Sequence, residues 1–283
     1  MVCQSTDVRE CFLGIDESRF IEINYTKSGL KKNKHVVKIG NVNVTTVKTD
    51  EKLVQSTMAV RDLGQELCVF SETHRLGFEK LENWSDRSEL QGWRFIGTGN
   101  PKKAISGVGV VLSPDFEVLE TEVVVESRIL YLRMLYRGVR MQLFAVYAPT
   151  NMKSKTTKND FFRKLQSSVT EKSLKHPNWP KLCIGDFNAT IGKNAPLTKF
   201  IGPNLDTVPT TDMGQRMSQF MIENELYAMN TMFVTKKHRR TTWKLGKNQK
   251  RLDFFLADSF FKNSCKIREH TPMKLPFLKR TIL

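Results

Sequence analysis

The sequence has no long apolar run, no paired cysteines and no extended low-complexity tract. No stretch approaches the ~18 apolar residues that a membrane-spanning helix needs, and residues 1–9 do not lead into the apolar segment of a signal peptide. We therefore expect an intracellular protein without a membrane partner. With 40% hydrophobic and 26% charged residues, the composition is that of a folded globular chain.

The cysteine pattern excludes two further classes. The five cysteines are odd in number, widely spaced and never arranged as Cys-x-x-Cys. Neither a disulfide framework nor a zinc site is indicated. Cys68 and Cys183 lie in apolar runs typical of strands, where a free thiol behaves as a small hydrophobic side chain in a reducing compartment.

Acidic residues are few relative to basic ones. Forty-five Lys and Arg against 29 Asp and Glu leave a formal charge of +16, which attracts polyanions, and nucleic acid is the commonest of these. Residues 236–251 hold eight Lys or Arg and no acid, whereas residues 114–126 hold five acids and no base. The alternative is an ordinary solvated surface with a basic segment.

The course of the chain predicts one α/β domain with mixed sheets. Residues 1–37 carry little pattern and form an N-terminal appendage, with disorder as one alternative; the domain spans residues 38–275, followed by a tail at 276–283. A β-rich middle between residues 93 and 146 indicates an antiparallel meander. Other predicted strands are residues 36–47, 67–71, 181–185, 226–233, 251–256 and 264–268, with helices at 51–65 and around Phe161 and Phe220.

Polar residues recur where the apolar strands end, a place from which rigid elements present side chains to a shared cleft. Six residues fit this pattern: Asn43, Glu72, Tyr147, Asp186, Asn188 and Asp253. A carboxylate beside an apolar strand is costly to bury unless it is paired or binds a metal. Each position alone has an ordinary explanation, such as a strand-end cap for Glu72, a turn for Asn188 or a salt bridge between Asp253 and Arg251.

The order and wording of five segments resemble the endonuclease/exonuclease/phosphatase superfamily. The segments are Val42-Asn43-Val44, Ser71-Glu72-Thr73-His74, Val146-Tyr147-Ala148-Pro149, Gly185-Asp186-Phe187-Asn188 and Arg251-Leu252-Asp253-Phe254. Residues 106–110 and Thr241-Thr242-Trp243 are similar to the branch of apurinic-type endonuclease domains in LINE-like, non-LTR retrotransposons. The resemblance implies a four-layer α/β sandwich in which two mixed β-sheets are flanked by helices.

The resemblance also implies roles for the residues. Glu72 would help to hold Mg²⁺, with Mn²⁺ as an alternative, because a carboxylate is a hard oxygen ligand. Asp186 would orient and deprotonate the attacking water, and Asn188 and Tyr147 would donate hydrogen bonds to phosphate oxygens. Asn43 would orient neighbouring polar groups. The aspartate that matches Asp253 steadies a histidine in the family.

The chain departs from the family pattern at that histidine. A Ser-Asp-His triplet is due about 25 residues after the Asp253 segment, and Lys274-Leu275-Pro276 stands there instead. The pattern suggests a C-terminally truncated or spliced copy. His270 is the only downstream histidine, and its replacing the missing one is a hypothesis. Thr45 stands where apurinic-type relatives have an aspartate.

A basic segment before the Asp253 strand suits DNA, because its cations contact phosphates and its tryptophan offers a stacking face. The candidate nucleic-acid-binding residues are Lys236, Lys237, Arg239, Arg240 and Trp243. The sequence thus predicts a Mg²⁺-dependent DNA endonuclease that is a monomeric domain, with a nuclear location as one option. Two alternatives stay open: a catalytically impaired relative that binds nucleic acid through its basic face, and a phosphomonoesterase or lipid phosphodiesterase.

Overall fold

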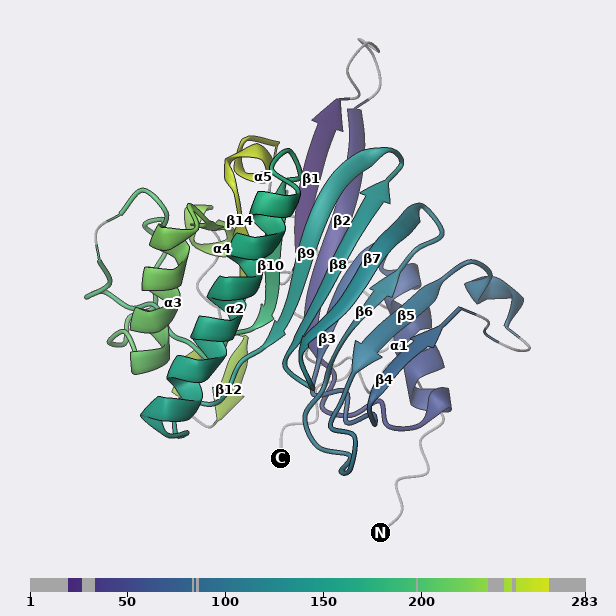
Figure 1. Cartoon of the computed structure of the whole chain (residues 1–283), viewed down its shortest axis with the longest axis horizontal. Coiled ribbons are helices and arrows are strands. Elements are labelled where there is room, and N and C mark those ends of the chain that lie inside the picture. Colours follow the sequence, from purple (N-terminus) through teal and green to yellow (C-terminus); the bar gives the residue numbers. More distant parts are fainter. Residues whose placement is uncertain are drawn as a thin grey trace, which may run out of the picture.

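The computed structural model describes residues 20–26, 34–82, 84, 87–196, 198–233, 242–245 and 248–264. In this part of the chain two six-stranded β-sheets lie face to face, and helices cover their outer faces (Figure 1). This arrangement is the four-layer α/β sandwich with two mixed sheets, so the predicted fold class is confirmed.

Sheet A is built mainly from the N-terminal half. Its strands, in spatial order, are β1 (Phe20–Thr26), β2 (Lys34–Asn43), β3 (Leu67–Ser71), β6 (Val108–Leu112), β5 (Arg94–Thr98) and β4 (Phe78–Leu81). Strands β2 and β3 are parallel, and the other neighbours are antiparallel. Because β1 pairs with β2, sheet A begins at residue 20, within the segment that the sequence suggests is an appendage.

Sheet B contains only the last three strands of the antiparallel meander predicted between residues 93 and 146, because the first two predicted strands pair with each other in sheet A. Its strands, in spatial order, are β11 (Tyr227–Ala228), β14 (Asp253–Ala257), β10 (Lys181–Asp186), β9 (Val139–Tyr147), β8 (Ile129–Tyr136) and β7 (Phe116–Val125). Strands β9 and β10 are parallel. A separate small hairpin joins β12 (Trp243–Leu245) to β13 (Asn248–Lys250).

Three helices of more than ten residues cover the sheets, and each begins at a Ser or Thr whose hydroxyl accepts a backbone N–H of the first turn. They are α1 (Asp50–Asp62), α2 (Lys155–Lys175) and α3 (Asp212–Glu223), capped by Thr49, Ser154 and Thr211. Shorter helices are α4 (Met229–Met232), α5 (Ser259–Ser264) and the 3₁₀ turn Ser88–Leu90.

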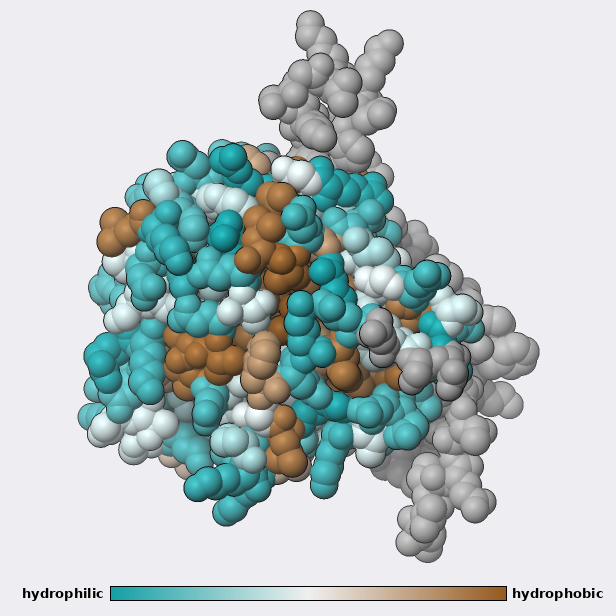
Figure 2. Space-filling view, turned by 45° about the vertical axis from the view of Figure 1, so that its right-hand side comes forward, coloured by the Kyte–Doolittle hydropathy of each residue, from teal (hydrophilic) through white to brown (hydrophobic). Residues whose placement is uncertain are grey.

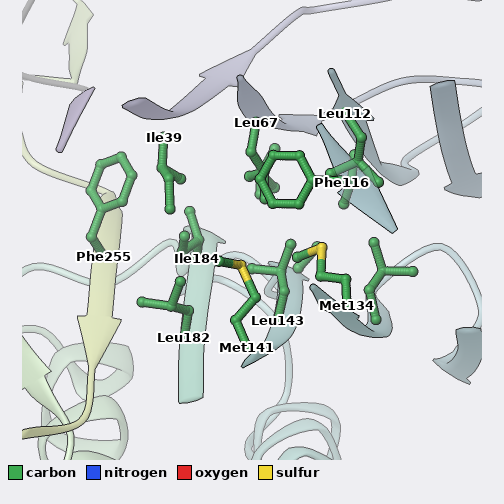
Figure 3. Packing of buried hydrophobic residues seen from close by; sticks show 14 of the residues in the cluster. Ile39, Leu67, Leu112, Phe116, Met134, Met141, Leu143, Leu182, Ile184 and Phe255 are labelled. Carbon is green, nitrogen blue, oxygen red and sulfur yellow. The ribbon is translucent and has the colours of Figure 1, made fainter. Parts of the chain in front are cut away.

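Three buried hydrophobic clusters fill the spaces between the four layers. One lies between the sheets, where Ile39 and Leu67 of sheet A point toward Leu143 and Ile184 of sheet B (Figure 3). The second packs α2 and α3 on the outer face of sheet B, and the third packs α1 on sheet A. Because side chains alternate along a strand, each sheet supplies one face to the central cluster and the other to a helix layer.

Two of the predicted strands are wrong or lie partly outside the structure. Residues 226–233 form only the two-residue strand β11, after which the chain turns into α4. The Thr231 hydroxyl bonds the Ala228 carbonyl in that short helix, which the apolar pattern alone did not predict. Ser264 ends α5 instead of beginning a strand, and residues 265–268 lie outside the described part of the chain.

Hydrophilic side chains cover most of the face seen in Figure 2, and apolar side chains lie between them in patches. Within the residues that the structure describes, no helix has both the length and the apolar composition needed to cross a membrane. The largest fully buried side chains, by contrast, belong to the interlayer clusters, among them Tyr131, Phe144 and Phe255.

Candidate active site

The rows of side chains that face the central cluster change from apolar to polar at one end. Along β2 the row runs from Ile39 to Asn41 and Asn43, and along β10 it runs from Ile184 to Asp186. The same change occurs on β3, β9 and β14, where Ser71, Tyr147 and Asp253 follow or precede apolar inner positions. We call this end the candidate site; it comprises Asn41, Asn43, Ser71, Glu72, Tyr147, Asp186, Asn188 and Asp253.

Sheet B brings three of these residues into one row. Asp186 pairs with Tyr147 on the parallel strand β9 and with Asp253 on the antiparallel strand β14. Gly185 makes the close approach of β9 possible, since a Cβ at this position would lie 1.8 Å from the Val146 carbonyl oxygen. The pairing of the strands alone therefore places the three polar side chains next to one another.

Two hydrogen bonds join this row to sheet A. The Tyr147 hydroxyl lies 3.1 Å from Glu72 Oε1, and Asn41 Nδ2 donates to Asp253 Oδ1 at 2.8 Å. Glu72 directly follows β3 and has a left-handed backbone with φ of 57°. Such a conformation is uncommon in a residue other than glycine and occurs often at functional sites.

Tyr147 is placed and tuned by its neighbours. Burial, and then the adjacent Glu72 carboxylate, raise the pKa of the Tyr147 phenol well above its usual value. The hydroxyl therefore stays protonated and can donate a hydrogen bond. The Arg128 guanidinium lies 4.5 Å from the centre of the Tyr147 ring and donates to the Ala148 carbonyl at 3.3 Å.

Asp186 and Asn188 are held by a tight turn after β10. The Asn188 backbone N–H donates to Asp186 Oδ1 at 2.8 Å, and Asn188 Nδ2 donates to the Ala148 carbonyl at 2.9 Å. Asn188 also has a positive φ of 47°. The turn that the sequence analysis offered as the ordinary explanation of Asn188 is thus present. The same turn orients the Asp186 carboxylate.

Asp253 is buried and its backbone is fixed from two sides. Its N–H donates to Thr242 Oγ1 at 3.3 Å, and its carbonyl accepts from Asn230 Nδ2 at 2.9 Å. Asn43, at the end of β2, is half-buried and accepts the Thr45 N–H at 2.9 Å. The structure therefore brings all six residues of the predicted constellation to one end of the sandwich.

The sequence analysis missed two members of the site, Asn41 and Ser71, and two residues that contact the site, Arg128 and Asn230. The alternation of inward and outward side chains along a strand could have identified Asn41 and Ser71. Each lies two positions after an inner-facing apolar residue of its own strand. Arg128 and Asn230 carried no such signal, because Arg128 precedes β8 in a turn and Asn230 lies in the helix that replaced a predicted strand.

Of the predicted nucleic-acid-binding residues, Lys236, Lys237, Arg239 and Arg240 lie outside the described residues, as does His270. Trp243 opens β12, and its side chain lies outside the described part of the structure.

The donor set suits a hard cation that keeps most of its water. Across the described residues, no three His, Cys, Asp or Glu side chains are grouped as a metal cage. Mg²⁺ usually takes one or two protein carboxylates and retains several waters. Glu72, half-buried at the end of β3 and next to the Tyr147 hydroxyl, is a carboxylate of this kind.

Comparisons with known proteins support the fold at low identity. No family model matches the sequence, and no curated protein matches it. Among solved structures, an AP endonuclease from Archaeoglobus fulgidus is 15% identical with a TM-score of 0.56, over 80% of this chain and 88% of that one. An AP endonuclease from Leishmania major is 14% identical with a TM-score of 0.55, over 93% and 85%.

A third similar structure is the endonuclease domain of TRAS1, described as a telomere-specific non-LTR retrotransposon. It is 13% identical with a TM-score of 0.50, over 78% of this chain and 84% of that one. At these identities the likeness shows the fold alone, since one fold hosts many functions. The chain therefore shares its fold with these endonucleases, as the resemblance of the five sequence segments predicts.

Proposed function

We propose that this chain hydrolyses phosphodiester bonds in the DNA backbone, as a Mg²⁺-dependent endonuclease. The observation that carries the proposal is the row of Tyr147, Asp186 and Asp253 beside Glu72 at one end of the inter-sheet core. A carboxylate base, a protonated phenol and a hard oxygen ligand are the groups that attack by water on a phosphate requires.

Asp186 would act as the general base. Its Oδ1 accepts the Asn188 N–H, which fixes the plane of the carboxylate for contact with a water molecule. Asp186 takes the proton as the water oxygen bonds to phosphorus, and the P–O bond to the leaving sugar oxygen breaks. When bound, Mg²⁺ would be held by Glu72 and would offset negative charge on the phosphate and leaving oxygen.

The phosphate oxygens gain charge during this attack, and neutral donors stabilise it. The Tyr147 phenol is protonated at neutral pH, so its hydroxyl can donate a hydrogen bond. Because this hydroxyl lies next to Glu72, it would be close to a phosphate that binds the Mg²⁺ held by Glu72. Asn188 carries a second amide N–H besides the one that bonds Ala148. Asn43 would orient polar groups at the end of β2.

DNA as the substrate is supported by charge and by the neighbours. The net charge of +16 favours association with a polyanion. One similar structure, a 3′ phosphatase from Neisseria with a TM-score of 0.53, is described as bound to a product DNA hairpin. The basic residues Lys236, Lys237, Arg239 and Arg240, with Trp243, would contact the DNA backbone. An origin in a LINE-like element, a monomeric state and a nuclear location belong to this proposal. The predicted domain of residues 38–275 is extended to residue 20 by the pairing of β1 with β2.

A second candidate is a relative that binds DNA without turnover. It is favoured by the lack of a Ser-Asp-His triplet in residues 269–283. Loss of one acid or base group lowers rates by about 10²- to 10⁴-fold. Steeply salt-dependent DNA binding without cleavage would select it.

One experiment separates the two candidates. Purified full-length protein is incubated with supercoiled plasmid in Mg²⁺ or in EDTA, beside an Asp186→Ala variant. Nicking that requires both Mg²⁺ and Asp186 supports the endonuclease. If no nicking occurs at high protein concentration while the plasmid is bound, the endonuclease proposal fails.

A further inference from the structure

A pocket of about 530 Å³ opens at the end of sheet B that lies opposite the candidate site. Its wall includes Trp179, Lys181, Lys199, Glu225, Tyr227 and Phe260. Strand β10 begins at Lys181 in this wall and ends at Asp186, so the pocket lies roughly 17 Å from the candidate site along the strand. Pockets for small ligands usually measure about 300–1,000 Å³, so this one is large enough for a nucleotide. We call it the distal pocket.

Three aromatic side chains, Trp179, Tyr227 and Phe260, line the distal pocket. Phe260, in the first turn of α5, is 45% exposed. The guanidinium carbons of Arg133 and Arg140 lie 4.9 and 5.7 Å from the centre of the Trp179 ring. Both arginines belong to the outer face of sheet B, so they support this ring from the side of the sheet. Aromatic rings placed in this way offer stacking surface to a planar ligand.

Cations accompany these rings. Lys181 and Lys199 line the distal pocket, and Lys199 is exposed. Lys262, on α5, adjoins the pocket because its Nζ lies 4.6 Å from the centre of the Tyr227 ring. Lysines beside stacking surfaces are the combination with which proteins bind single-stranded nucleic acid, since the cations contact phosphates and the rings contact bases.

Two carboxylates also line the distal pocket, and they are differently engaged. Asp258 Oδ2 accepts the backbone N–H of Lys181 at 2.8 Å. Asp258 Oδ1 accepts the N–H groups of Phe260 and Phe261 at 3.1 and 3.3 Å, so this carboxylate ties α5 to β10. Glu225 is exposed in the turn after α3. Its carboxylate suits the N–H groups that bases carry on their Watson–Crick edges.

We propose that the distal pocket is a second nucleic-acid site, which binds a nucleotide of a single strand. A base stacked on Trp179 or Phe260 would present its Watson–Crick edge to Glu225. Its phosphate would lie near Lys181 and Lys199. In a duplex the faces and the Watson–Crick edges of the bases are covered, so the site favours single strands. The inference goes beyond the proposed function, because binding here requires neither hydrolysis nor Mg²⁺.

The test measures anisotropy of a fluorescein-labelled oligothymidylate with full-length protein in EDTA, which prevents Mg²⁺-dependent cleavage. Phe260→Ala should raise Kd about fivefold or more, because a stacking surface is lost. Lys199→Ala should reduce the salt slope by about 0.7, as expected for one phosphate of a single strand. Both residues are exposed, so the variants should fold normally. Binding of a duplex should change less than about twofold in either variant.

Two matched controls lie elsewhere on the surface. Leu119→Ala, at a position on β7 that is 40% exposed, controls for the loss of an exposed apolar side chain. Lys164→Ala, on α2, controls for the loss of one charge. Both should bind the single strand within about twofold of the wild type.

A crosslinking experiment locates the bound strand. An oligonucleotide that carries iodouracil reacts on irradiation with an aromatic side chain next to the base, and mass spectrometry identifies the peptide. Crosslinks to Trp179, Tyr227 or Phe260 support the inference. It is overturned if the wild type does not bind the single strand, if every crosslink lies outside the distal pocket, or if Phe260→Ala and Lys199→Ala bind as the wild type does. Absence of nicking would remove the proposed function and leave this result unchanged.

Discussion

Two buried polar groups lie on opposite faces of sheet B and are built on different principles. On the outer face, Lys172 of α2 pairs with Glu120 and Glu122 of β7, and Glu120 also bonds Arg133 and His176. We call these five residues the Lys172 cluster. On the inner face, the candidate site brings Asp186 next to Asp253 and supplies amides as their donors.

The Lys172 cluster is arranged to stabilise the fold, whereas the candidate site is arranged to carry out a reaction. In the Lys172 cluster opposite charges meet, so that Lys172 is 3% exposed yet compensated by two carboxylates. Burial raises the pKa of Glu120, but hydrogen bonds from Lys172 and Arg133 outweigh this effect and lower it to about 2. The acid-rich segment 114–126 is therefore neutralised partly within the fold. In the candidate site, two carboxyl side chains lie on adjacent strands, and Asn41 Oδ1 and Ser71 Oγ are buried without a hydrogen-bond partner among the described residues, which costs stability.

The largest expected difference between the candidate site and the Lys172 cluster comes from removal of the proposed base, Asp186. Asp186→Asn keeps the shape of the side chain but cannot accept a proton, so the nicking rate should fall by about 10²- to 10⁴-fold while the melting temperature changes little. Nicking of supercoiled plasmid and thermal melting measure the two effects. Asp160→Asn, at an exposed position on α2, is the control and should nick normally. Equal nicking by both variants would remove Asp186 from the mechanism.

The next largest effect concerns the metal ligand. Glu72→Gln keeps the hydrogen bond acceptor for Tyr147 but loses the negative charge, so half-maximal nicking should need a roughly 10-fold or higher Mg²⁺ concentration. EDTA should abolish nicking by the wild type. Glu89→Gln, which is exposed in the 3₁₀ turn, controls for charge alone. An unchanged Mg²⁺ titration for Glu72→Gln would contradict the assignment.

Glu120→Gln should do the opposite, by lowering stability without changing the chemistry. It leaves Lys172 and Arg133 short of a partner, and the free energy of unfolding at pH 7 should fall by about 1–3 kcal/mol. Because the folded pKa of about 2 lies below the ordinary 4.5, the wild-type advantage is present above pH 4.5 and is lost as the pH falls through 2.

Denaturant unfolding at several pH values measures this advantage, and nicking is measured on folded protein. Glu171→Gln, at an exposed position on α2, is the control and should change stability much less. A stability difference that persists at pH 2, or a large loss of nicking in folded Glu120→Gln, would erase the contrast between the two groups.

The smallest effect is expected at the rim of the site. Lys102 and Lys103 are exposed in the loop 99–107, which is hydrogen-bonded to the segment just after Glu72. Replacing both with alanine should weaken DNA binding and reduce the salt slope by about 1 for each phosphate that a lysine no longer neutralises. Lys164→Ala on α2 provides the control. An unchanged slope would place the DNA elsewhere.

Strand ends and their polar residues could be predicted because a short apolar run followed by a polar residue is a local pattern. The buried strand at Leu67–Ser71 and the turn after Asp186 follow from a few adjacent residues. The bond between Asn41 and Asp253 could not be predicted, because it depends on how the two sheets stack and joins residues 212 positions apart in sequence. The helix at Met229–Met232 was missed for another reason: a short apolar run does not distinguish helix from strand, and in the folded chain the Thr231 hydroxyl bonds the Ala228 carbonyl within this helix.

Gly185 has a consequence for how this protein would respond to random mutation. Any side chain there must displace the Val146 carbonyl, and with it the strand that carries Tyr147. Alanine at this position changes no reacting group, yet it would separate the phenol from the base. A mutational scan scored by nicking alone would thus rank Gly185 among the catalytic residues, although its whole contribution is the space that it leaves empty.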